Sequence, residues 1–252
     1  MAAEAHGKID ALGQFELHSA LGGLGRSVNF TNSNLLMVIG SLLIVGVLYY
    51  GARPQAIVPG RLQALAETAY SGIMDMAVGA IGEEGKRYFP FVFTLFFFVL
   101  MGNMLGLIPY SFTYTSHIAV TAGLAVMVIV IVTVVALRIH GLHFFSYFFP
   151  QGAPKLLAPI IIPIEIISYL SRPVSLSIRL FANMVAGHVM FEVFATFILL
   201  LAGAGAVTGA IGILPLALNV VLEGFELLVA ALQAYVFAIL TCIYLHDAVH
   251  LH

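Results

Sequence analysis

Long stretches of this chain carry no charged side chain, and this feature limits its fold more than any other. Three of them, residues 34–50, 89–109 and 118–137, approach the ~20 residues that a helix needs to cross about 30 Å of hydrocarbon. Only 9% of the residues are charged and 61% are hydrophobic, so the charges cannot cover a water-facing surface. The stretches lack the polar–apolar alternation of a membrane barrel, and we therefore predict an all-α membrane protein.

The first two spans are separated by a segment with a different pattern. Between residues 61 and 82, apolar and polar side chains follow a helical period. The apolar positions are Leu62, Leu65, Ala69, Ile73, Met76 and Ala80. This segment is too polar to span a bilayer, and we expect an amphipathic helix that lies at the membrane interface or packs against a soluble partner.

Basic residues predict the orientation of the spans. The connection between the first two spans holds more of them than the N-terminal segment does. They are Arg53, Arg61, Lys86 and Arg87, against Lys8 and Arg26. Because cytoplasmic loops are enriched in Lys and Arg, we expect the N-terminus outside and the C-terminus in the cytoplasm. Residues 1–33 are polar and lack a signal-peptide pattern, so we expect them to be retained as an outer N-terminal segment.

The fourth apolar region, residues 156–202, is too long for one upright span, since it would form a helix about 70 Å long. Either it breaks into two spans near Pro173, or it is one steeply tilted helix. The break would place Arg172 and Arg179 outside, so the charge bias favours the tilted helix. A turn at residues 203–210 then leads to a second long helix over 211–245. We thus predict about five membrane-embedded helices, with segments 1–33, 34–155 and a tilted hairpin over 156–252.

Polar residues form a stripe on the fourth region, at spacings that return to one face of a helix. They are Glu165, Ser168, Arg172, Ser175, Arg179 and Asn183. Ionisable groups at membrane depth cost at least ~3 kcal/mol each and indicate function. Glu165 and Arg172 could form an internal ion pair that only stabilises the bundle. Arg179 has no acidic residue within one turn, so we expect its counter-charge to come from a partner protein.

A second polar face is predicted on the last helix. It contains Asn219, Glu223, Glu226, Gln233 and Tyr244. His188 lies nine residues after Arg179 and therefore points away from the arginine stripe. An antiparallel hairpin would bring Glu223 and Glu226 to the level of His188, and Tyr244 to the level of Glu165. Titratable groups on both sides of a fixed cation are the elements of a proton path, because a guanidinium cannot relay a proton by losing its own.

Other classes of function lack support in the sequence. A formal net charge of −2 gives no reason to expect a nucleic-acid partner. We find no internal repeat typical of a secondary transporter and no GxSxG or HExxH motif of a hydrolase. One cysteine and the pair His246 and His250 do not predict a metal site, so no cofactor is expected.

The sequence EIISYLSRPVSLSIRLFANMVAGHVMFE, followed by LEGFELLVAALQAYVFAILTCIYL, resembles subunit a of F-type ATP synthases. The resemblance implies that Arg179 faces the proton-carrying carboxylates of the c-ring, with Asn183 and Gln233 beside it. It also implies that His188 and Glu226 form the titratable pair of the outer half-channel, which Glu223 joins, and that Glu165 and Tyr244 lie towards the cytoplasmic exit.

The same resemblance implies a non-catalytic, proton-translocating stator subunit in a bacterial inner membrane, with a mitochondrial inner membrane less expected. Its partners would be the c-ring at the Arg179 face, the peripheral-stalk b subunits and the rest of the complex. Some bacterial relatives have the acid and the histidine of positions 188 and 226 exchanged, and some have an aspartate at the position of Gly106, near Asn103. The sequence leaves open whether the ion is a proton or sodium.

Overall fold

The computed structural model describes residues 31–52, 59–108, 113–149, 157–203 and 212–250, which are almost entirely helical. The elements in chain order are α1 (Asn32–Ala52), α2 (Arg61–Ile81), α3 (Gly85–Gly106), η2 (Tyr114–Ser116), α4 (Ile118–His140), η3 (Gly141–Phe148), α5 (Ala158–Gly203) and α7 (Ile213–Val249). Five of them, α1, α3, α4, α5 and α7, are long and apolar enough to cross a membrane. The prediction of an all-α membrane protein with about five membrane-embedded helices is confirmed.

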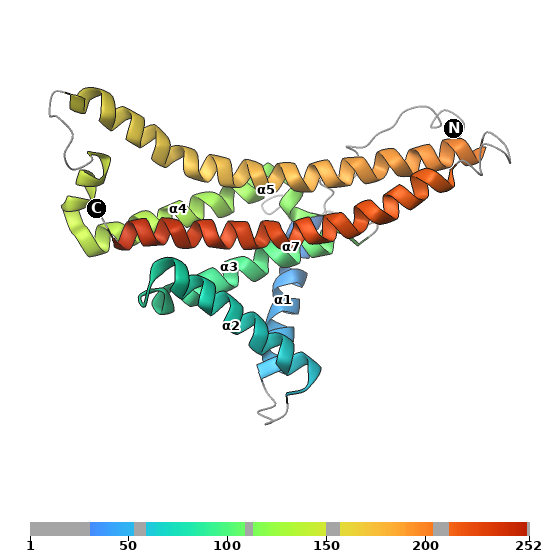
Figure 1. The fold of residues 1–252 in the computed structure, drawn as a ribbon, viewed down its shortest axis with the longest axis horizontal. Coiled ribbons are helices and arrows are strands. Elements are labelled where there is room, and N and C mark those ends of the chain that lie inside the picture. Colours follow the sequence, from blue (N-terminus) through green and yellow to red (C-terminus); the bar gives the residue numbers. More distant parts are fainter. Residues whose placement is uncertain (1–30, 53–58, 109–112, 150–156, 204–211, 251–252) are drawn as a thin grey trace, which may run out of the picture.

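The fourth apolar region is one continuous helix, although it contains Pro163 and Pro173. The alternative with a break near Pro173 is therefore wrong. Helix α5 curves along its length, and α7 runs beside it to form a hairpin (Figure 1). The predicted turn at 203–210 and the predicted N-terminal segment 1–33 fall almost wholly outside the described residues.

Helix α2 confirms the predicted amphipathic helix, but its buried side differs from the predicted apolar face. Ile73, Ala77 and Ile81 are buried, whereas Leu62 and Leu65 are exposed. The N-terminal half of the predicted face is thus available to a bilayer surface. The helix ends at Gly82, whose positive φ of 91° few other residues adopt and whose N–H donates to the Val78 carbonyl over 2.8 Å.

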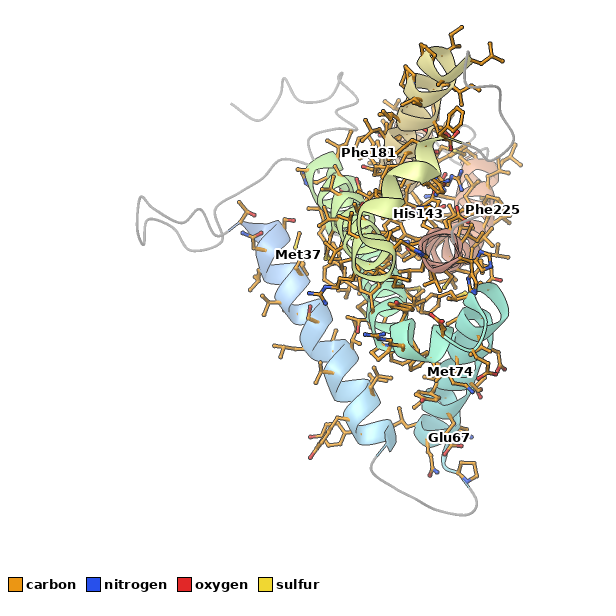
Figure 2. All side chains as sticks on the ribbon, turned by 90° about the vertical axis from the view of Figure 1, so that its left-hand side faces the viewer. Met37, Glu67, Met74, His143, Phe181 and Phe225 are labelled. Carbon is orange, nitrogen blue, oxygen red and sulfur yellow. The ribbon has the colours of Figure 1, made fainter. Side chains whose placement is uncertain are left out.

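The core gathers around α7, which packs against α2, α3, α4 and α5. Its buried face carries Ala230, Ala234 and Ala238, all 0% exposed, and these small side chains let neighbouring helices come close. Helix α5 is the least buried of the five apolar helices, and few side chains of α1 are buried; Figure 2 shows α1 at one side of the molecule. The hairpin therefore has one well-packed helix, α7, and one largely uncovered helix, α5.

Candidate functional site

Arg179 lies on α5 with its side chain exposed, next to the fully buried Leu180. In the part of the chain that the structure describes, no acidic side chain forms an ion pair or hydrogen bond with it. This geometry agrees with the expectation that Arg179 receives no counter-charge from its own chain.

Arg172, two turns earlier on the same stripe, has the opposite environment. Its Nη1 donates to Asp247 Oδ2 over 3.0 Å, and its Nη2 donates to the Tyr147 hydroxyl over 2.7 Å. Its guanidinium also lies over three aromatic rings, those of Tyr147, Tyr169 and Tyr244, at 5.9, 5.6 and 5.2 Å from their centroids. We call Tyr147, Tyr169, Arg172, Tyr244 and Asp247 the Arg172 cluster.

The predicted alternative of an ion pair between Glu165 and Arg172 is wrong. In the described residues the partner of the Arg172 guanidinium is Asp247 of α7, and Glu165 forms no ion pair with it. Glu165 is half-buried on α5, close enough for its charge to act on Tyr147. The sequence analysis did not assign Asp247 this role. The sequence did contain an indication of this role: Asp247 follows Tyr244 by three residues, and residues at this spacing are neighbours on a helix surface.

Asn183 and Gln233 lie between the two ends of the hairpin. Asn183 Nδ2 donates to Gln233 Oε1 over 2.9 Å, and Gln233 is 4% exposed. Asn183 follows Arg179 by one helical turn, so the two residues are neighbours on the surface of α5. The structure thus brings together the three residues that the resemblance grouped.

Glu226 is buried, with 6% of its surface exposed, and its carboxylate lies directly against Gly187 of α5. A side chain at position 187 would collide with Glu226 Oε1 and Cδ, so the glycine makes room for the acid. Neither carboxylate oxygen accepts a hydrogen bond from the described residues. Since Gly187 precedes His188, the structure brings the predicted acid and histidine to the same level of the hairpin.

Glu223 corrects the predicted polar face of α7, because it is exposed while Glu226 is buried. Three residues turn a helix about 60° short of a full circle, so Glu223 lies at the edge of the face and not in its centre. Asn219 is half-buried, and its Oδ1 has no partner among the described residues.

His188 bonds to a residue that sequence reasoning missed. Its Nε2 lies 2.7 Å from Thr113 Oγ1, just before η2. The Thr113 side chain occupies the space next to Gly106, where any side chain would collide with it. With Thr113 in this place, only a glycine fits at position 106.

Asn103 on α3 is a further buried polar residue that contacts the hairpin. It is fully buried, and its Nδ2 donates to the Ala230 carbonyl of α7 over 3.1 Å, while its Oδ1 has no partner among the described residues. A buried amide on α3 and a threonine before η2 thus accompany the acid and the histidine. We call Asn103, Thr113, His188 and Glu226 the His188 group.

The polar residues of the hairpin thus occupy three levels. Along the hairpin, Arg179, Asn183 and Gln233 lie between the His188 group and the Arg172 cluster. Tyr244 lies at the level of the Arg172 cluster, since its ring centroid is 5.2 Å from the Arg172 guanidinium.

Comparison with known proteins finds one family that matches most of the chain. Residues 34–246 match the family described as ATP synthase A chain. A protein described as ATP synthase subunit a from Granulibacter bethesdensis is 71% identical over 100% of both chains. Another with this description, from Gluconacetobacter diazotrophicus, is 61% identical over 96% of this chain and 97% of the relative. A third, from Rhodospirillum rubrum, is 51% identical over 90% of this chain and 92% of the relative.

These relatives are bacterial, and five helices of the chain are long and apolar enough to cross a membrane, which together indicate a bacterial inner-membrane protein. Each comparison covers at least 90% of this chain, so the similarity includes helices α1 to α4 as well as the hairpin of α5 and α7. The chain belongs to the family of ATP synthase subunit a.

Proposed function

We propose that this protein is the non-catalytic stator subunit that passes protons to and from the rotor of an F-type ATP synthase, through two offset half-channels separated by Arg179. One observation carries the proposal. Two arginines lie on the same stripe of α5, and the chain neutralises Arg172 with Asp247 but offers no such partner to Arg179 among the described residues. A buried or lipid-facing cation needs a counter-charge, so an external acid is required at Arg179.

The external acid would be the carboxylate of a c-ring subunit that passes the exposed side of α5. Apolar side chains flank Arg179 on this side, including Val174 and Ile178, which are 56% and 50% exposed. An apolar surface with one central cation suits a rotor that presents one carboxylate at a time. The guanidinium keeps its charge because its pKa exceeds 12, so it blocks a direct proton wire between the two routes.

The inlet route would lead past Glu223, Glu226 and His188. Glu223 is exposed and Glu226 is buried beside it, so the two carboxylates form a step from the surface to the interior. Several buried polar atoms in this region have no protein partner among the described residues, namely Glu226 Oε1 and Oε2, Asn103 Oδ1, Gln233 Nε2 and Thr115 Oγ1. Buried polar atoms are normally satisfied by ordered water, and a chain of such atoms supports a hydrated inlet.

The exit route would pass Glu165 and Tyr244 at the cytoplasmic end of the hairpin. This assignment follows from the charge bias, with the N-terminus outside and the C-terminus in the cytoplasm. Peripheral-stalk b subunits and the rest of the complex would hold the chain against the torque of the ring. One proton that crosses 100 mV releases only about 2.3 kcal/mol, so a leak past Arg179 would dissipate energy that must be summed over many protons.

The test is Arg179→Ala in the whole complex, reconstituted in vesicles. We expect the complex to assemble and to lose proton-driven ATP synthesis. Arg138→Ala is the matched control, because Arg138 is an exposed arginine on α4, a different helix from the one that carries the polar stripe. Normal ATP synthesis by Arg179→Ala would refute the proposal, and equal losses in both variants would show a general effect of charge.

A further inference from the structure

We propose that Asp247 is a positioning residue that holds the Arg172 guanidinium away from Glu165 and so keeps Glu165 free to accept protons that leave the rotor. This inference rests on the exit role of Glu165 proposed above. It assigns a function to an ion pair whose two members are 75 residues apart in sequence.

Asp247 holds Arg172 at a junction of several elements. Arg172 comes from α5, Asp247 and Tyr244 come from α7, and Tyr147 comes from η3. Val132 and Ala136 of α4 line the small cavity beside this junction. The Arg172 side chain keeps only 20% of its surface exposed, so a lost counter-charge is not replaced by bulk water.

Asp247 is the counter-charge of Arg172 within the cluster. Burial raises the pKa of the Tyr147 hydroxyl, so this phenol is neutral at physiological pH and accepts a hydrogen bond from Arg172 without neutralising it. The other cluster members, Tyr169 and Tyr244, contribute ring faces. The charges of Arg172 and Asp247 cancel, and Glu165 remains as a carboxylate without an ion-pair partner among the described residues.

Removal of the Asp247 charge would leave a desolvated cation two turns from Glu165 on the same face of α5. Helical side chains lean towards the N-terminus of their helix, so Arg172 leans towards position 165, while Glu165 leans in the same direction and must change rotamer to meet it. The two side chains are long enough together to span the roughly 10.5 Å between their positions. An Arg172–Glu165 ion pair would favour the ionised carboxylate and make it a poor proton carrier.

The experiment measures proton flux through the intact complex in vesicles, normalised to the amount of assembled complex. Asp247→Asn should lower the flux by about tenfold, which corresponds to about 1.4 kcal/mol. The double variant Arg172→Gln/Asp247→Asn should restore most of the flux, because it removes the cation that would capture Glu165. Thr133→Val is the control, since it removes two neutral 2.6 Å hydrogen bonds, to the Tyr169 hydroxyl beside Arg172 and to the Ile129 carbonyl, changes no charge and should leave the flux unchanged.

The double variant separates a positioning role from a structural one. If the Arg172–Asp247 ion pair only stabilises the fold, the double variant should be as impaired as Asp247→Asn. This result would overturn the inference. Failure of the double variant to assemble would also overturn it, whether or not Asp247→Asn assembles. Glu165→Gln tests the underlying proposal separately: unchanged flux in that variant refutes the exit role itself, whereas impaired Glu165→Gln with unimpaired Asp247→Asn refutes only the role of Asp247.

Discussion

Gly187 offers a direct test of how α5 and α7 fit together, because its missing side chain is the space that the Glu226 carboxylate occupies. Gly187→Ala would place a methyl group on that carboxylate. Overpacking of this kind costs about 1–3 kcal/mol, whereas alanine gains about 0.5–1 kcal/mol over glycine within a helix. The balance disfavours the native position of the acid by up to about 2.5 kcal/mol, which reduces its population by a factor of up to about 70.

The assay is passive proton flux in vesicles that contain the assembled complex. Gly187→Ala should lower the flux several-fold, and adding Glu226→Asp should restore part of it, because the shorter side chain withdraws one methylene from the collision. Gly123→Ala is the matched control, since Gly123 is also within an apolar helix and has no atom within 4 Å of the added methyl group. Equal flux in Gly187→Ala and Gly123→Ala would refute the argument that Gly187 seats Glu226.

Three further variants address the polar residues around the same acid. Thr113→Val removes the hydrogen bond to His188 with little change in shape, and we expect lower proton flux at normal assembly; unchanged flux would exclude a role for this bond. Tyr114→Phe removes the 2.7 Å bond to the Phe98 carbonyl and should destabilise the protein by about 0.5–1.5 kcal/mol, which an unaltered thermal transition in detergent would contradict. Asn103→Leu replaces a fully buried amide by an apolar group of similar size and should reduce flux, whereas wild-type flux would remove Asn103 from the hydrated route.

The positions of the helices could be predicted from the sequence because hydrophobic run length and charge bias both act locally. The single helix α5 is the clearest case, since placing Arg172 and Arg179 in an outer loop conflicted with the charge bias. Helix arithmetic also placed Glu226 and Gln233 on one face of α7, and both are buried.

Contacts between helices were harder to predict, because a helical wheel gives the angle of a residue but not the position of the neighbouring helix. The ion pair of Arg172 depends on the register between α5 and α7, and Asp247 lies 75 residues away in sequence. The same applies to Thr113, which reaches His188 across 75 residues. Glu223 is exposed because α5 covers only the part of the α7 face that contains Glu226.

The unequal burial of the two hairpin helices suits the proposed function. Helix α7 is backed by α2, α3 and α4, and its buried alanines pack closely against them, so the side chains it contributes are held in place. Helix α5 is the least buried apolar helix and carries the free guanidinium on its exposed surface. A stator must resist displacement while one of its surfaces slides past a rotor. A rigid inner helix and an uncovered outer helix meet both requirements, because the close packing is confined to the side away from the moving partner.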